Sequence, residues 1–157
     1  MIITKTPYRL SLFGGGTDFP EWYRNKPTTL VVAAMDYYCY VLLTRKPNFF
    51  HDYISKIAYS DIEYVNKNTE IKHPSVRECL RYFNFETGID LAHFGDLPAR
   101  SGIGSSSSFT VGLLKAIHGL KNSRVTKQLL AKEAIYVEQE MIGEAVGVQD
   151  QIAASYG

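Results

Sequence analysis

Short apolar runs alternate with turn-forming residues in the first half of the chain, whereas longer apolar runs with helical spacing dominate the second half. Runs rich in β-branched and aromatic residues, bounded by Gly, Pro, Asn or Asp, predict strands. These runs are residues 2–3, 8–13, 30–34, 37–44, 57–59, 62–65 and 89–94. Helical spacing and helix-end signals predict helices over residues 19–25, 74–83, 106–120 and 126–142. Strands first and helices afterwards, with short connections, predict an α+β fold.

The last of these helices has clear ends but an ambiguous polar face. Thr126 is its expected N-cap, and Gly143 lies just past its end. Its apolar stripe, which we expect in the core, consists of Leu130, Ala134, Val137 and Met141. Glu133, Glu138 and Glu140 flank this stripe at comparable angles. Periodicity therefore leaves open which glutamate faces a site and which faces water.

Composition indicates an ordinary globular protein and excludes several classes. The chain has 157 residues, 45% hydrophobic and 21% charged, which is enough for one domain with a core. A net charge of +1 gives no sign of a nucleic-acid or membrane-surface binder. Cys39 and Cys79 lack metal-ligand spacing, and we expect free buried thiols. The longest apolar run, 30–35, is too short to span a bilayer. With no visible secretion signal, we expect a cytoplasmic protein.

The segment Leu97–Ser108 is a glycine-rich loop that opens into an apolar helix. Such a loop holds anions, because glycines admit close approach and the first helical turn offers free N–H groups. Its four consecutive serines add donors and one ligand for a hard cation. It is not a Walker A loop, because Ser105 follows Gly104 where that motif has lysine. A flexible serine–glycine linker is the alternative, but its place between a strand and a helix disfavours one.

Two further segments carry polar groups suited to a binding site. Near the start, Gly14-Gly15-Gly16 follows a strand and presents Thr17 and Asp18, whose oxygens suit sugar hydroxyls. An Asx-type turn that caps the next helix is the alternative for this segment. Near the end, Asp150 lies between two glutamines, after Gly143 and Gly147. It is either a positioned base or a structural anchor. The four histidines show no metal-ligand spacing and are interpreted as structural.

These three segments, in this order, resemble the GHMP kinases, the superfamily named for galactokinase, homoserine kinase, mevalonate kinase and phosphomevalonate kinase. Its phosphate loop reads roughly P-x-x-x-G-L-G-S-S-[SA]-[SA], and residues 98–108 match it with Ile103 in place of leucine. Galactokinases carry P-G-R-x-x-L-x-G-E-H-T-D near the start. Residues 7–9 and 14–18 fall in register with it, with Gly15-Gly16 replacing glutamate and histidine. That replacement resembles the branch of D-glycero-D-manno-heptose 7-phosphate kinases.

The resemblance implies roles for individual residues. Asp150 would be the catalytic aspartate, with Arg9 beside it to stabilise developing negative charge. The magnesium-binding pair would be Ser106 and Glu138, since Glu138 precedes Asp150 by the twelve positions of galactokinase-like members. The substrate-binding turn would comprise Gly16, Thr17 and Asp18. The ATP-binding residues would be Pro98, Arg100, Ser101, Gly102, Ile103, Gly104, Ser105, Ser106 and Ser107.

The resemblance also implies the architecture and its partners. Residues 1–157 would form a GHMP kinase N-terminal ATP-binding domain, of the ribosomal protein S5 domain 2-like type. Family members are roughly twice this long, so we expect the C-terminal ferredoxin-like domain to be absent. We therefore expect an apolar surface where that half packs. It would bind a separately encoded half or support a homodimer.

The expected activity is phosphoryl transfer from ATP and Mg²⁺ to a hydroxyl of a sugar or sugar phosphate. The resemblance favours D-glycero-D-manno-heptose 7-phosphate as the substrate, phosphorylated at its 1-position, in nucleotide-activated heptose synthesis. The alternatives are a GHMP kinase for fucose, galactose or mevalonate, or a non-catalytic fragment that binds ATP or sugar. The residues leave the adenine pocket unplaced.

Overall fold

A computed structural model describes residues 1–46, 52–98 and 101–157 of the chain. Its centre is one five-stranded sheet with the spatial order β1-β2-β5-β3-β4. The strands are β1 (Ile2–Phe13), β2 (Val31–Arg45), β3 (Ser55–Ala58), β4 (Ile62–Val65) and β5 (Ile89–Gly95). Neighbouring strands run antiparallel except β3 and β5, which are parallel. The α+β class predicted from the sequence is confirmed.

Two pairs of predicted strands are each one long strand. β1 joins residues 2–3 to 8–13, and β2 joins 30–34 to 37–44. The polar stretch inside β1 is strand because Thr4 and Thr6 are buried, and the Thr4 hydroxyl donates a 2.9 Å bond to the Gly112 carbonyl. Pro7 is tolerated because β1 is an edge strand. The pairing of β1 with β2 shifts register after Pro7, so the strands bend there.

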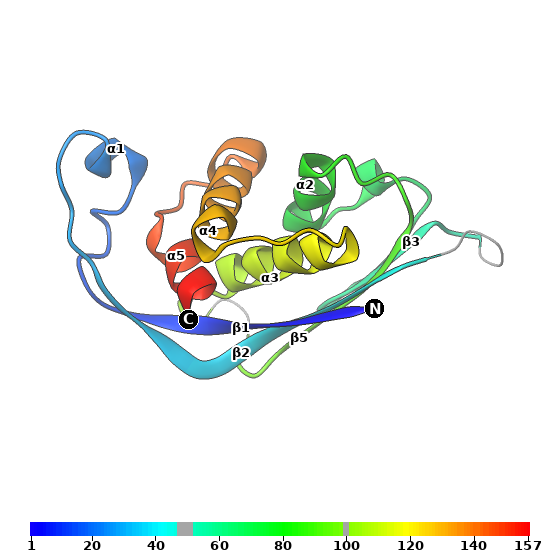
Figure 1. Ribbon diagram of the computed structural model, residues 1–157, viewed down its shortest axis with the longest axis horizontal. Coiled ribbons are helices and arrows are strands. Elements are labelled where there is room, and N and C mark those ends of the chain that lie inside the picture. Colours follow the sequence, from blue (N-terminus) through cyan, green and yellow to red (C-terminus); the bar gives the residue numbers. More distant parts are fainter. Residues whose placement is uncertain (47–51, 99–100) are drawn as a thin grey trace.

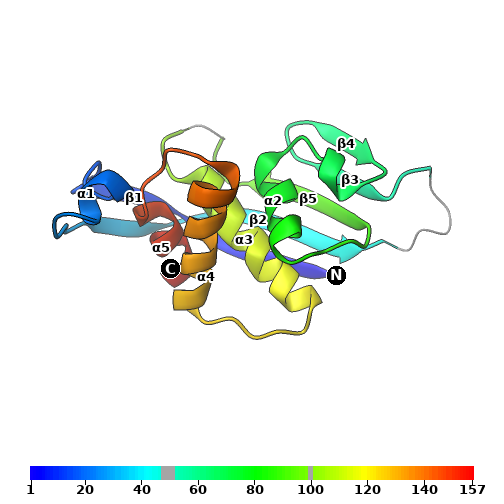
Figure 2. The same ribbon diagram turned by 90° about the horizontal axis from the view of Figure 1, so that it is seen from above.

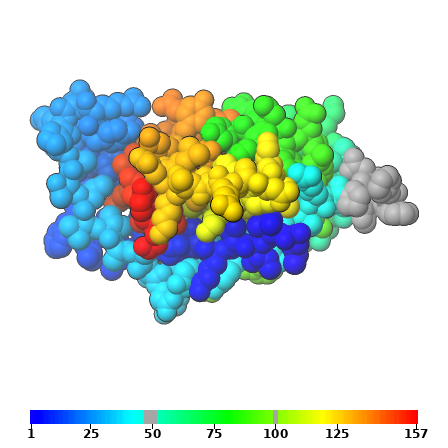
Figure 3. Space-filling view, in the orientation of Figure 1, coloured from blue at the N-terminus to red at the C-terminus, as the bar shows by residue number. Residues whose placement is uncertain are grey.

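The helices cover one face of the sheet, as Figures 1 and 2 show. The α-helices are α1 (Pro20–Tyr23), α2 (Pro74–Tyr82), α3 (Ser105–Leu120), α4 (Lys127–Tyr136) and α5 (Gln149–Tyr156). A 3₁₀-helix, η1 (Asn68–Glu70), and a π-helix, η2 (Val137–Ile142), complete the set within the described ranges. The sequence pattern missed α5, because its buried residues are mostly small or polar. α1 lies at the far end of the β1–β2 ribbon, where the molecule protrudes (Figure 3).

The helix predicted over residues 126–142 changes type along its length. Thr126 caps it as expected, since its hydroxyl accepts a 3.1 Å bond from the Leu129 N–H. From Val137 the helix widens to π-type pairing and ends at Gly143, which is left-handed with φ +77°. Short π-helical turns often mark functional sites. Val137 and Glu138 are its buried residues.

The core lies between the sheet and α3, which is buried along most of its length. Its largest buried side chains include Leu43, Ile57, Leu91, Leu113, Leu114 and Ile117. Cys39 and Cys79 are buried and free, as expected. Among the described residues, no helix is both long enough and apolar enough to cross a bilayer.

Gly112 sets how closely α3 approaches the sheet. A Cβ at this position would lie 2.8 Å from the Thr6 Oγ1 and 3.3 Å from the Thr4 Oγ1. Gly112→Val should therefore lower the free energy of unfolding by about 1–3 kcal/mol through overpacking, although valine favours helix more than glycine does. Urea unfolding followed by circular dichroism measures this. The matched control is Lys115→Val, an exposed position on the same helix. An equal loss in both variants would contradict the close-packing argument.

Candidate active site

The glycine-rich loop ends in an uncapped helix start. Gly102 and Gly104 are both left-handed, with φ +71°, and Gly104 is the N-cap residue of α3. No side chain of the described residues caps α3, and its helical pairing begins with the 2.9 Å bond from Ser108 N–H to the Gly104 carbonyl. The first-turn N–H groups are therefore free to bind an anion, with the positive end of the helix dipole behind them.

The four consecutive serines divide into two pairs. Ser105 and Ser106 line the pocket beside the loop, and Ser106 is exposed. Ser107 is buried, and its hydroxyl donates a 2.8 Å bond to Glu138 Oε2. Ser108 is also buried, and it donates a 2.8 Å bond to the Pro7 carbonyl. One pair thus faces the ligand side, and the other anchors α3 to η2 and β1.

A two-bond ion pair joins Arg9 of β1 to Asp150 of α5. Arg9 Nε lies 2.6 Å from Asp150 Oδ1, and Arg9 Nη2 lies 2.9 Å from Asp150 Oδ2. Arg9 Nη1 also donates a 2.6 Å bond to the Gly102 carbonyl, and the Arg9 backbone N–H bonds the Ile103 carbonyl at 3.1 Å. A Cβ on Gly104 would lie 3.1 Å from both partners of the pair. The loop, β1 and α5 therefore meet at this ion pair.

The three glutamates of the last helix have three different environments. Glu133 is buried, 2.8 Å from His118 Nε2. Glu140 is exposed and lies 3.6 Å from Arg24. Glu138 is completely buried, and its Oε2 accepts bonds from Ser107 and from Gln151 Nε2. Of the three, Glu138 alone lies behind the glycine-rich loop.

The Glu138 carboxyl has unused capacity to bind a cation. Burial raises its pKa above the ordinary value, against the opposing effect of hydrogen bonds from nearby donors. Its Oε1 has no hydrogen-bond partner among the described residues. Carboxylate and hydroxyl oxygens are ligands that Mg²⁺ prefers. Glu138 and Ser106 therefore fit a magnesium site by their chemistry.

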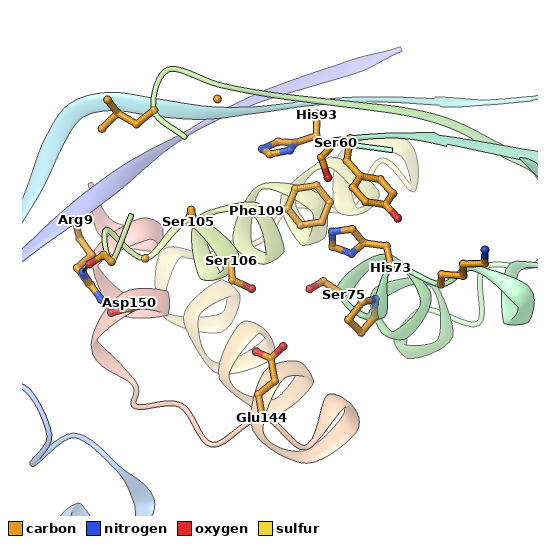
Figure 4. A pocket seen from close by; sticks show the side chains of 17 residues that line it. Arg9, Ser60, His73, Ser75, His93, Ser105, Ser106, Phe109, Glu144 and Asp150 are labelled. Atoms are coloured by element: carbon orange, nitrogen blue, oxygen red, sulfur yellow. Dashed lines mark hydrogen bonds and ion pairs between the residues drawn. The ribbon is translucent and has the colours of Figure 1, made fainter. Parts of the chain in front are cut away.

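A pocket of about 830 Å³ extends from the ion pair along the start of α3 (Figure 4). Arg9, Asp150, Gly102 and Gly104 line one end. Ser60, Tyr59, His73, His93 and Phe109 line the other end. Glu144, in the loop between η2 and α5, points toward the middle of the pocket from the side opposite Ser106.

The far end of the pocket is a ring cluster that the sequence did not reveal. His73 and His93 each lie about 5 Å from Phe109, with centroid distances of 4.9 and 5.0 Å. Burial lowers the pKa of both imidazoles, while the nearby Glu63 carboxylate opposes the shift at His73. His73 Nδ1 and His93 Nε2 have no hydrogen-bond partner among the described residues. The pocket therefore ends in two neutral rings, each with a buried nitrogen that lacks a hydrogen-bond partner among the described residues. No local spacing signals them, because they come from separate elements.

The predicted substrate turn is ordered and lies against α5. Gly16 is left-handed, with φ +91°, and a Cβ on it would meet open space. The Thr17 hydroxyl donates a 2.8 Å bond to the Gly14 carbonyl. The Asp18 carboxylate is completely buried and accepts bonds from the backbone of Gly16 and Gln149. That Asp18 binds sugar hydroxyls stays a prediction.

The remaining predicted loop residues lie at the edge of the site. The Ser101 hydroxyl donates a 2.6 Å bond to the Pro98 carbonyl, which closes the loop on itself. Ile103 packs against the core from a partly buried position. Arg100 lies outside the described residues. Among the pocket residues that sequence reasoning did not select are Glu144, His73, His93, Tyr59, Lys72 and Phe109.

Comparison with known proteins identifies the family. Residues 70–157 match the family described as GHMP kinases N terminal domain, and the chain belongs to this family. The chain is 32% identical over 165 residues to D-glycero-alpha-D-manno-heptose 7-phosphate kinase of Campylobacter jejuni subsp. jejuni serotype O:2, covering 99% of this chain and 48% of that protein. It is 28% identical over 162 residues to a galactokinase of Thermococcus kodakarensis, covering 97% and 43%.

Solved structures share the fold. A D-glycero-D-manno-heptose 1-phosphate kinase from Bacteriodes thetaiotaomicron superimposes with a TM-score of 0.85 at 23% identity, covering 100% of this chain and 54% of that one. Mevalonate kinase of Methanococcus jannaschii superimposes with a TM-score of 0.74 at 20% identity, covering 99% and 51%. The chain thus has the GHMP kinase N-terminal fold, and it spans about half the length of the curated relatives it matches.

The division of the serines predicts unequal effects of two similar substitutions. Ser107→Ala removes a donor to a buried carboxylate, so we expect the free energy of unfolding to fall by about 1–3 kcal/mol. Ser106→Ala changes an exposed hydroxyl and should alter it by less than about 0.5 kcal/mol. Urea unfolding of both variants at neutral pH measures the difference. Similar losses in the two variants would show that the assignment of the inward and outward serines is wrong.

The two buried imidazoles predict acid-sensitive stability. Their pKa values are lower in the folded than in the unfolded chain, so the unfolded chain binds more protons just below the ordinary histidine pKa of about 6.5. Stability contributed by the neutral rings is present at higher pH and is lost as the pH falls below that value. Urea unfolding at pH 7.5 and 5.5 measures this loss.

The control is the double variant His73→Phe, His93→Phe, which keeps ring packing without the titrating groups. The Glu138 carboxyl, whose pKa is raised, changes the stability with the opposite sign as the pH falls. Its effect is the same in the parent protein and the double variant, so it cancels when the two pH dependences are subtracted. An undiminished loss of stability in the double variant would assign the effect to other groups.

Proposed function

We propose that the chain forms the nucleotide-binding half of an ATP-dependent sugar kinase. The fold and family place it among small-molecule kinases. The whole activity is a proposal, because the chain spans about half of its curated relatives. The observation that carries the proposal is the Arg9–Asp150 pair, which lies directly beside the glycine-rich loop. An anion site alone needs no such carboxylate, whereas transfer of a phosphoryl group to a hydroxyl does.

ATP would lie along the pocket from the loop to the ring cluster. Its phosphates would bind the backbone N–H groups from Gly102 to Ser107, which include the first turn of α3. Its base would lie among Tyr59, His73 and Phe109, whose rings suit stacking, with neutral His93 at the edge. Pockets of this size and mixed lining are typical of nucleotide-sized ligands.

Magnesium would be held by Ser106 and Glu138. When bound, it would neutralise charge on the transferring phosphate oxygens. A cation there would also offset the burial of the Glu138 carboxylate, whose Oε1 lacks a partner among the described residues. Glu144 lies across the pocket from Ser106 and adds a second carboxylate to this part of the pocket.

The acceptor hydroxyl would approach between Asp150 and the turn that contains Gly16, Thr17 and Asp18. Gly16 is exposed and a Cβ on it would meet no heavy atom within 4 Å, so this turn is open to an approaching sugar. Asp150 would accept the hydrogen bond of the attacking hydroxyl and orient its oxygen toward the γ-phosphorus. The Arg9 guanidinium would stabilise the negative charge that develops as the bond to ADP breaks.

A heptose phosphate is the substrate that we propose, because the relative that matches over 99% of the chain is a heptose 7-phosphate kinase. Galactokinases and a mevalonate kinase also match, so another sugar or small alcohol is the alternative.

A cytoplasmic location, a separately encoded second half and a homodimer stay predictions. A non-catalytic binding module is disfavoured by the formed Arg9–Asp150 pair.

A coupled assay of ATP consumption tests the proposal. It would compare heptose 7-phosphate with free heptose, galactose, fucose and mevalonate in the presence of Mg²⁺. The assay would use this chain and a version that continues through any coding sequence that follows it. Turnover with the heptose phosphate is expected, at least in the longer form. Turnover with a different acceptor would correct the substrate, and none in either form would favour the binding module.

Asp150→Asn should lower turnover by about a hundredfold or more, because the amide no longer offers two acceptor oxygens to the hydroxyl and to Arg9. ATP binding, followed by titration calorimetry, should change little. The matched control is Asp90→Asn, a half-buried aspartate on β5 outside the pocket. Near-normal turnover of Asp150→Asn would remove this residue from the catalytic role.

A further inference from the structure

α5 starts without a cap of its own, although it positions the proposed catalytic carboxylate. The residue at its N-cap position is Val148, whose side chain has no polar atom, and Asp150 lies in the first turn. The helix is only eight residues long. Free N–H groups at such a start need partners from elsewhere. The place of the first turn, and therefore of Asp150, depends on those partners.

Asp18 supplies these partners from the opposite end of the chain. Its Oδ2 accepts a 3.3 Å bond from the Gln149 N–H, and its backbone carbonyl accepts a 3.2 Å bond from the Val148 N–H. Its Oδ1 accepts a 3.0 Å bond from the Gly16 N–H. Both carboxylate oxygens are thus used by backbone donors, and the residue has no exposed surface. A carboxylate at a helix start also complements the helix dipole.

Gly147 makes this contact possible. A Cβ at Gly147 would collide with the Asp18 carboxylate, so only glycine lets the chain pass at this distance. The neighbouring residues reinforce the contact, since the Ser11 hydroxyl donates a 2.7 Å bond to Gln149 Oε1. The turn itself is held by the bond from the Thr17 hydroxyl to the Gly14 carbonyl. The glycine-rich turn and the start of α5 therefore form one connected unit.

We propose that Asp18 is a positioning residue that caps α5 and thereby holds Asp150 against Arg9 and the phosphate loop. This inference rests on the proposed function for the role of Asp150, but the cap itself does not. Asp18 thus acts on Asp150 through the backbone of α5. In its absence, the first turn of α5 would fray and Asp150 would lose its place beside Gly104.

Hydrogen exchange without any ligand tests the cap. Asp18→Ala should speed amide exchange in the segment 148–152 about tenfold, as expected for loss of a helix cap. Asp18→Asn keeps one acceptor oxygen and the size of the side chain, so it should show a smaller increase in exchange rate. It replaces the alanine variant in this test if that variant fails to fold. The matched control is Glu70→Ala. Glu70 Oε2 also accepts two backbone N–H bonds, but at η1, and the change should leave exchange in α5 unaltered.

Kinetics of the same variants separate positioning from sugar binding. A positioning role predicts that kcat falls at least tenfold while the KM for the sugar changes less than about threefold, with partial recovery in Asp18→Asn. Unchanged exchange in α5, together with a raised sugar KM at normal kcat, would overturn the inference and make Asp18 a sugar ligand. If the parent protein phosphorylates no acceptor, the proposed function fails. The exchange result then still decides whether Asp18 caps α5.

Discussion

The ion pair between Arg9 and Asp150 is the contact on which the site depends. It joins the edge strand β1 to α5, two elements that are 141 positions apart in sequence. Arg9 also binds the loop, because its Nη1 donates to the Gly102 carbonyl and its backbone N–H donates to the Ile103 carbonyl. One side chain thus fixes the glycine-rich loop and the Asp150 carboxylate relative to the sheet. Two charge-assisted bonds in a fork geometry make this contact directional as well as strong.

Glu138 shows how the same region combines structure with chemistry. A fully buried carboxylate with one unpartnered oxygen is unfavourable in an apolar surrounding. Ser107 and Gln151 satisfy the other oxygen, which ties α3 and α5 to the π-helical turn. The remaining unfavourable burial is what a cation would relieve. The protein thus keeps a buried and partly unpartnered carboxylate behind the first turn of α3 at a cost in stability.

Glycine is used at this site for close contact more than for flexibility. Gly104 lets the loop pass against the Arg9–Asp150 pair, and Gly147 lets the chain pass against Asp18. Gly112 does the same for α3 on the sheet. In each case a single methyl group would push apart two elements that carry site residues. Close approach of the backbone at these glycines thus brings segments that are distant in sequence into direct contact.

The sequence by itself determined the fold class, most strands and helices, and the glycine-rich loop at the start of α3. These follow from short-range patterns, because glycine, proline and apolar spacing act on the local backbone. It missed α5, whose few large apolar residues leave no clear stripe, and the continuity of β1 and β2, which depends on pairing with neighbours. Local patterns do not record such partners.

Only the tertiary structure decided which way equivalent side chains face. Ser106 and Ser107 are neighbours of the same type, yet one lines the pocket and the other binds Glu138. Three glutamates at comparable helical angles were separated by the π-helical widening and by partners from other elements. His73 and His93 reach the pocket from elements that the chain brings together only on folding. The direction in which a side chain faces depends on packing between segments that are distant in sequence. The spacing of residues along the chain does not contain that information.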